Sequence, residues 1–119
     1  MGRGQSLGQF EQVVLTAVLS LSEDAYGVRI HARVGELSAP RSASLGAVYV
    51  TLDRLEDKGL VRSWLSEPTR ARGGRAKRCY ELQALGERAL RESAESVHRL
   101  HAVLSQAWGS RTWKPARIP

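Results

Sequence analysis

Residues 42–61 read SASLGAVYVTLDRLEDKGLV, and this segment predicts one complete amphipathic helix followed by the start of a β-strand. Its large apolar residues recur at helical spacing and share one face, namely Leu45, Val48, Leu52 and Leu55. Ser42 to Ser44 offers N-cap oxygens before the helix, which we expect to run to Lys58. Gly59 ends the helix, because glycine takes the left-handed conformation that lets Leu60 fold back on Leu55.

The opposite face of this helix has an unusual composition. It carries Ala47, Val50 and Arg54, and it is flanked by Tyr49, Thr51 and Asp53. A solvent-facing helix normally carries Lys, Glu and Gln, whereas small, apolar and hydroxyl side chains suit close approach to a partner surface. We therefore interpret this face as a functional surface.

Two β-prone segments follow the helix. Residues 60–65 are rich in apolar and aromatic residues and residues 78–82 alternate apolar with polar, so the two segments pair as strands. Their connection, residues 66–77, contains Pro68, Gly73 and Gly74. Five of the nine residues from 70 to 78 are basic and none is acidic: Arg70, Arg72, Arg75, Lys77 and Arg78. Because a lone two-stranded ribbon is marginally stable, we expect it to lie against the helices with its basic tip projecting.

Two further helices are predicted before residue 42. Leu7, Phe10, Val14, Ala17 and Leu21 recur at steps of three and four, which predicts a helix from Leu7 to about Ser20. Ser6 with Gln9 forms a capping-box pattern at its start. Tyr26, Ile30, Val34 and Leu37 define a second, shorter helix, which ends where Ser38-Ala39-Pro40 stops it.

The last predicted helix is long for so small a chain. It begins near residue 85, and its candidate inward positions are Leu85, Ala89, Val97, Leu100, Leu104 and Trp108. An apolar stripe that extends past its own core needs cover, which residues 7–20 could supply in part and a second copy of the chain could supply in full. We favour a homodimer through Leu90, Val97, Leu100, Leu104 and Trp108. The expected division is a domain over 1–83, a dimerisation helix over 84–108 and a flexible basic tail over 109–119.

Composition excludes several classes of protein. The 119 residues allow one domain, and the single cysteine, Cys79, excludes an intramolecular disulfide framework and a cysteine-built zinc site. His98 and His101 lack a clear third metal ligand, so we interpret them and His31 as solvated or interface histidines. No segment predicts a membrane span, a signal peptide, a phosphate-cradling loop or a catalytic constellation. We therefore expect a cytoplasmic protein that is not an enzyme and binds no cofactor.

The order of the elements indicates a DNA-binding protein. Three helices followed by a two-stranded basic hairpin form a winged helix-turn-helix, an α+β and mostly α fold in which the third helix enters the major groove. The net charge is +6, and residues 41–81 contribute +4 of it. Base contacts would come from positions 43–54, namely Ala43, Ser44, Ala47, Tyr49, Val50 and Arg54. Phosphate contacts would come from the wing, namely Arg70, Arg72, Gly74, Arg75 and Lys77. A dimer would bind double-stranded DNA at a pseudo-palindromic operator.

The sequence also resembles the PadR-type transcriptional regulators. The carriers of the likeness span residues 7–90: Leu7-Gly8, Phe10-Glu11, Ala25-Tyr26-Gly27, the run 46–61, Gly73-Gly74-Arg75, Lys77-Arg78, Tyr80, Leu82 and Gly86. The resemblance implies a bacterial homodimeric repressor with a winged-helix domain and, as in the short-chain branch, a single C-terminal helix. Some short members bind flat aromatic compounds between subunits, so Trp108 is a possible effector-pocket residue as well as an interface residue. Gln83-Ala84 departs from the Thr-bearing turn that commonly begins the last helix of the family.

A different class of function is also compatible with these features. The helix face with Ala47, Tyr49 and Val50 would serve equally as an apolar protein-binding patch, with the arginines facing an acidic partner. The alternative is therefore a winged-helix protein-interaction module without sequence-specific DNA binding.

Overall fold

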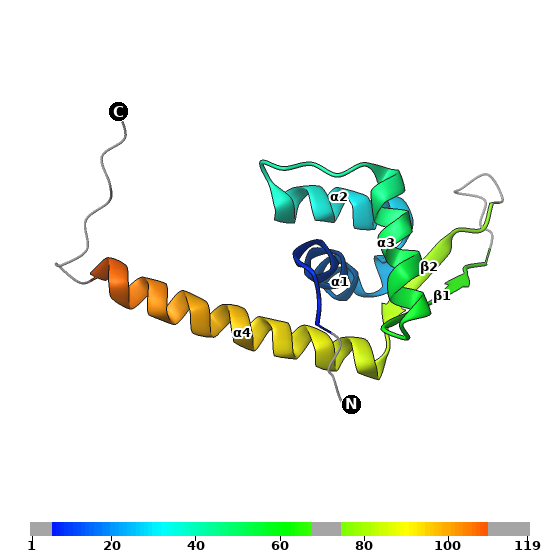
Figure 1. Ribbon diagram of the computed structural model, residues 1–119. Helices are drawn as coiled ribbons and strands as arrows, with labels where there is room; N and C mark the ends of the chain where they lie inside the picture. The colour runs from blue at the N-terminus through cyan, green and yellow to red at the C-terminus, as the bar shows by residue number, and fades with distance from the viewer. Residues whose placement is uncertain (1–5, 68–74, 110–119) are drawn as a thin grey trace.

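The computed structural model describes residues 6–67 and 75–109 and shows helices packed beside a small antiparallel sheet (Figure 1). The elements are α1 (Gln9–Leu21), the 3-10 turn η1 (Ser22–Asp24), α2 (Gly27–Ser38), α3 (Leu45–Asp57), β1 (Val61–Leu65), β2 (Arg78–Leu82) and α4 (Ala84–Gly109). The predicted winged helix-turn-helix with a long C-terminal helix is confirmed. No helix among the described residues combines the length and the hydrophobicity that crossing a bilayer requires.

The core lies where α1, α2, α3 and the sheet meet. Its fully enclosed side chains come from every one of these elements and include Leu15, Ile30, Leu52, Val61 and Tyr80. Burial, with the negative charge of Asp53 as a smaller contribution, raises the pKa of Tyr80 to about 12. Several amphipathic elements thus share one apolar interior, as expected for a domain of this size.

The first helix begins later than the capping pattern predicts. Gly8, not Ser6, is the N-cap of α1, and its N–H donates to Glu11 Oε1 at 3.0 Å. Burial raises the pKa of Glu11, but the hydrogen bonds from the Gly8 N–H and from Lys58 Nζ outweigh it and leave that pKa below its ordinary value. The capping prediction was wrong because Glu11, three residues after Gly8, accepts the Gly8 N–H and organises the first turn there. The same carboxylate also pairs with Lys58, with 3.0 Å between Lys58 Nζ and Glu11 Oε2.

Two side chains lie differently from their predicted positions. Leu37, assigned to the inward face of the second helix, is 47% exposed because α2 reaches beyond the core at its last turn. Thr51, assigned to the flank of the outer face, is buried within α3. The apolar face of α3 is therefore wider, and its exposed face narrower, than the spacing of the leucines predicts.

Both ends of α3 are as predicted. The Ser44 hydroxyl accepts a hydrogen bond from the Ala47 N–H at 3.0 Å and caps the first turn. Gly59 has φ of +79°, and the Leu60 N–H donates back to the Leu55 carbonyl at 2.9 Å. These contacts follow the usual pattern of a serine-capped, glycine-terminated helix.

The ribbon is tied to the helices on two sides. β1 and β2 pair antiparallel with Ser63 opposite Tyr80. On the outer side of β2, the Tyr80 N–H donates to the Ala25 carbonyl at 2.8 Å, and Tyr26 forms an isolated bridge with Cys79. The segment between η1 and α2 thus adds a short third edge, which supports a ribbon that would be marginal alone.

The last helix leaves the body immediately after β2. Gly86 is buried in its first turn, and a Cβ atom built there would lie 2.0 Å from the Leu60 carbonyl oxygen. Only the first turns of α4 pack on the body, and the rest extends past α1 (Figure 1). Of the six inward candidates only Ala89 is buried within the protomer.

Candidate nucleic-acid interface

The outer face of α3 is open to solvent along its length. Val50 is 58% exposed, Asp53 and Arg54 are exposed, and Ala47 is half-buried beside them. No ion pair within the described residues engages Arg54. The Arg54 guanidinium, whose charge also helps to lower the pKa of Glu11, is exposed and accessible to a partner that accepts hydrogen bonds.

Tyr49 is held against the start of α2 rather than projecting freely. A Cβ atom built on Gly27 would lie only 1.8 Å from the Tyr49 hydroxyl oxygen, so the ring occupies the space that any other residue at position 27 would fill. Tyr49 remains 36% exposed. The Ala25-Tyr26-Gly27 motif therefore has a packing function that the sequence alone does not reveal, because positions 27 and 49 meet only in the fold.

The loop that leads into α3 is anchored to α2. His31 Nε2 lies 2.7 Å from the Ala43 carbonyl oxygen, so the protonated ring nitrogen donates to this carbonyl. His31, which the sequence suggests is a solvated or interface histidine, is half-buried and holds the loop. Ala43 and Ser44 consequently stand at a fixed N-terminal end of α3, which is the part of a recognition helix that contacts base edges.

The base of the wing contains two of the predicted phosphate-binding residues. Arg75 is exposed, whereas Lys77 is half-buried with its ammonium 3.3 Å from the centroid of the Tyr26 ring, a cation–π contact. The Ser66 N–H donates to the Lys77 carbonyl at 2.8 Å, which continues the ribbon beyond its last strand pair. The predicted phosphate contacts Arg70, Arg72 and Gly74 lie outside the described residues.

A polar network that sequence reasoning missed joins α3 to the wing. Glu56, in the last turn of α3, accepts hydrogen bonds from the Ser63 N–H at 3.2 Å and from the Ser63 hydroxyl at 2.9 Å. Arg78 donates to the same hydroxyl at 2.9 Å. Glu56 had no signal of this role in the sequence beyond being a carboxylate near a strand. The network fixes the wing relative to α3.

The predicted dimerisation residues follow one side of α4. Leu90 packs against the core and is half-buried, while Val97, Leu100, Leu104 and Trp108 are each about half or more exposed, up to 65% at Leu100. Val103 adds to the same apolar stripe at 64% exposure. Isolated exposed apolar residues are common, but a stripe of this length on one helix marks an interaction surface.

The remaining reactive side chains of the described part of the chain are one buried cysteine and two exposed histidines. Cys79 is buried and carries a free thiol. Within residues 6–67 and 75–109, no group of three or more His, Cys, Asp or Glu side chains is placed to hold a metal ion. His98 and His101 are both exposed on α4.

The sequence profile of the transcriptional regulator PadR-like family matches residues 14–92, which include the core helices, the sheet and the first turns of α4. The chain belongs to this family. The resemblance seen in the sequence is thereby confirmed, and PadR family members are transcriptional regulators, not enzymes. A comparison with curated protein sequences gives no significant match.

Solved structures of PadR family proteins are similar to this one. A PadR family transcription regulator from Clostridium difficile is 27% identical, with a TM-score of 0.68 over 86% of this chain and 100% of that chain. A PadR-like transcription factor from Bacteroides fragilis is 25% identical, with a TM-score of 0.66 over 83% of this chain and 89% of that chain. The ORC1 protein of Aeropyrum pernix, solved in complex with DNA, is 27% identical with a TM-score of 0.60 over 79% of this chain and 26% of that chain.

Proposed function

We propose that this PadR family protein is a dimeric repressor that binds double-stranded DNA through α3 and the wing. The observation that carries the proposal is the outer face of α3, where Val50 and Arg54 are exposed on a helix whose ends are fixed by the Ser44 cap and by the hydrogen bond from the Leu60 N–H to the Leu55 carbonyl. A rigid helix with small side chains fits the major groove, and an arginine there pairs bidentately with guanine. A segment that makes up 26% of the ORC1 chain has a similar fold, and the ORC1 protein was solved in complex with DNA, which supports the assignment.

The base contacts in this proposal come from Ala43, Ser44, Ala47, Tyr49, Val50 and Arg54. Phosphate contacts come from Arg75 and Lys77 at the base of the wing, together with Arg70, Arg72 and Gly74 of its tip. In the described structure Lys77 lies on the Tyr26 ring, so its contribution requires the ammonium to turn toward the DNA. Phosphate contacts position a protein on the duplex, whereas the α3 contacts select the sequence.

The proposed dimer forms through the exposed apolar stripe of α4, with residues 1–83 as the DNA-binding domain and 84–108 as the dimerisation helix. Sedimentation at micromolar concentration should show a dimer, and Leu100→Glu should yield monomers, because it places a charge in the centre of the stripe. A wild-type monomer under these conditions would refute the dimer. A small aromatic effector next to Trp108 would relieve repression, and quenching of tryptophan emission by added aromatic compounds tests that part.

The experiment that tests DNA binding compares two duplexes of equal length, the upstream DNA of the protein's own gene and a scrambled version, by fluorescence anisotropy at two salt concentrations. We expect a preference of about 10³-fold or more for the upstream DNA. Equal, salt-sensitive binding to both duplexes would contradict specific recognition there and would favour the protein-interaction module. Transcription from the bound promoter in vitro should fall when the protein is added, and a rise would refute repression.

Three arginine variants separate the roles of α3 and the wing. Arg54→Ala should weaken binding to the preferred duplex by about 1–3 kcal/mol and relax its sequence preference. Arg75→Ala should weaken binding to both duplexes alike and reduce the salt slope by about 1. Arg91→Ala is the matched control, since it removes the same charge from α4, where Arg91 pairs with Glu87. An equal loss on both duplexes for Arg54→Ala would refute the assignment of α3 as the recognition helix.

A further inference from the structure

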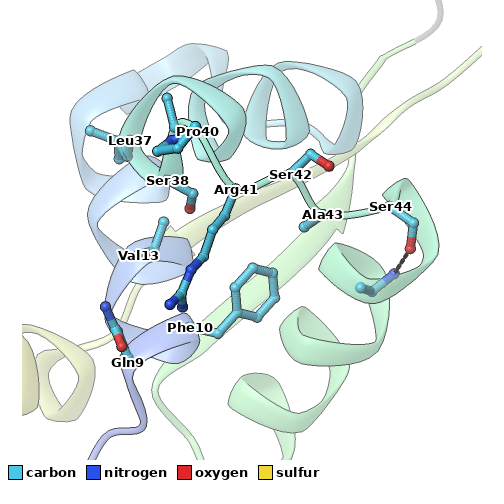
Figure 2. A pocket seen from close by; sticks show the side chains of 12 residues that line it. Gln9, Phe10, Val13, Leu37, Ser38, Pro40, Arg41, Ser42, Ala43 and Ser44 are labelled. Carbon is cyan, nitrogen blue, oxygen red and sulfur yellow. Dashed lines mark hydrogen bonds between the residues drawn. The ribbon is translucent and has the colours of Figure 1, made fainter. Parts of the chain in front are cut away.

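A hollow of about 800 Å³ opens between the first turns of α1, the end of α2 and the loop into α3 (Figure 2). Its walls are largely apolar and come from Phe10, Val13, Leu37, Pro40, Ala43 and Ala47. This volume lies within the usual range for small-molecule sites, which combine apolar walls with a few polar groups that fix orientation. The hollow lies in the winged-helix body and does not include Trp108 or any other residue of α4.

One charged group faces this hollow. The Arg41 side chain extends from the loop toward Phe10 and Gln9 (Figure 2). Its backbone N–H donates to the Ser38 carbonyl at 2.9 Å, which fixes the position from which the side chain departs. Arg41 forms no ion pair with any residue in the ranges 6–67 and 75–109, and no acidic residue lines the hollow.

We propose that this hollow binds an apolar monocarboxylate, with its carboxylate on the Arg41 guanidinium and its hydrocarbon part against Phe10, Val13 and Leu37. An arginine guanidinium pairs with a carboxylate through two parallel hydrogen bonds, which selects this group in geometry as well as in charge. A neutral apolar molecule would desolvate the guanidinium without giving it an acceptor. A cationic molecule would be repelled by the positive charge of the guanidinium.

The hollow shares residues with the proposed DNA interface. Ala43, Ser44 and Ala47 line it and also form the N-terminal end of α3. The His31 bond to the Ala43 carbonyl and the Ser44 cap hold this end in place, so a ligand in the hollow lies against the same residues that would contact bases and competes with DNA for them. This coupling step rests on the proposed function, whereas ligand binding itself does not.

Ligand binding is tested on the full chain without DNA, by isothermal titration calorimetry with octanoate. Octanol and octylammonium are the matched probes, because they keep the hydrocarbon chain and remove or reverse the charge. Arg41→Gln removes the guanidinium and Leu37→Trp fills the hollow. Arg29→Gln and Val28→Trp are their controls, since both change exposed positions of α2 outside the lining of the hollow.

We expect octanoate to bind at least tenfold more tightly than octanol or octylammonium. Arg41→Gln should weaken octanoate at least tenfold and Leu37→Trp should abolish its binding, while both control variants keep wild-type affinity. Equal affinity for octanoate and octanol would overturn the proposal, as would an unchanged affinity in Arg41→Gln. Failure of octanoate to bind a wild-type protein that is folded by circular dichroism would overturn it as well.

The coupling is tested by anisotropy on the preferred duplex at saturating octanoate. A several-fold loss of DNA affinity in the wild type, absent in Arg41→Gln, supports the coupling, and unchanged DNA affinity in the wild type overturns it. A protein that binds octanoate through Arg41 but has no preferred duplex would refute the proposed function and leave the ligand site standing. The two failures are therefore distinguishable.

Discussion

Replacing Gly86 by alanine should destabilise the protein, whereas the same replacement at Gly35 should stabilise it. Both glycines lie within helices, Gly86 in the first turn of α4 and Gly35 in α2. Alanine is the better helix former by about 0.8–1.0 kcal/mol, so propensity alone predicts a gain at either site. What differs is the space available to the added methyl group.

At Gly86 a Cβ atom would lie 2.0 Å from the Leu60 carbonyl oxygen and 2.9 Å from its carbonyl carbon. These are backbone atoms, which cannot swing aside, and the same oxygen accepts the Gln83 N–H at 2.8 Å. Overpacking a filled site costs about 1–3 kcal/mol. Weakening that hydrogen bond adds about 1 kcal/mol. After the gain in helix propensity, the net loss for Gly86→Ala is about 1–3 kcal/mol. At Gly35 nothing lies within 4 Å of the Cβ position, so the whole gain remains.

The measurement is urea unfolding followed by circular dichroism, with wild type and both variants at one protein concentration because the stability of the proposed dimer would depend on concentration. With a slope of about 1–3 kcal/mol per molar urea, we expect the midpoint to fall by about 1 M in Gly86→Ala and to rise by a few tenths of a molar in Gly35→Ala. Shifts in the same direction for the two variants would refute the claim that contact with Leu60 requires glycine at position 86.

Three further perturbations test single contacts. Gly27→Ala should reduce DNA affinity, because the added methyl group displaces the Tyr49 ring. When Tyr49→Ala is also present, the methyl group at position 27 has room, so the double variant should bind DNA no worse than Tyr49→Ala alone. Additive losses of DNA affinity, measured by anisotropy, would contradict the contact. Because the pKa of Glu11 is lowered in the folded state, its pairing with Lys58 stabilises the fold above the unfolded carboxyl pKa of about 4.3, and this stabilisation is lost as the pH falls. Between pH 6 and pH 3 the free energy of unfolding should therefore decline less steeply in Glu11→Gln than in the wild type. Equal slopes would refute this. The pKa of Tyr80 is about 12 in the folded protein and about 10 in the unfolded chain, so the free energy of unfolding falls as the pH rises from 10 to 12. Tyr80→Phe should make this fall shallower. An unchanged dependence on pH would argue against Tyr80 as its origin.

The features predicted correctly from the sequence depend on neighbours along the chain. Ser44, Gly59 and the spacing of the leucines set both ends and the buried face of α3 through contacts only a few residues apart. The strands are equally local, since β-prone residues and a turn-rich connection define them. Family membership followed from the run 46–61 for the same reason, because its residues combine these local signals.

The features that were missed arise between distant positions. Glu11, which caps the start of α1, also pairs with Lys58 at the end of α3. His31 holds Ala43, and Tyr49 fills the space above Gly27, yet neither pair is visible in a linear pattern. The charged tip of the wing was predicted from composition and lies outside the described residues, and composition does not show that the neighbouring Lys77 turns back onto Tyr26.

Leu60 joins the proposed recognition helix to the proposed dimerisation helix. Its N–H donates to the Leu55 carbonyl at the end of α3, and its carbonyl accepts the Gln83 N–H at the start of α4. The residue is fully buried, so both bonds are shielded from water. Leu60 thus ties the end of α3 to the start of α4 through two backbone hydrogen bonds. In a two-fold dimer built on α4, this contact holds each α3 on its own α4, so the separation of the two α3 helices then depends on the contact between the two α4 helices. An operator with one or two base pairs added between its half-sites should consequently lose affinity, because the DNA and not the protein must deform to accommodate them.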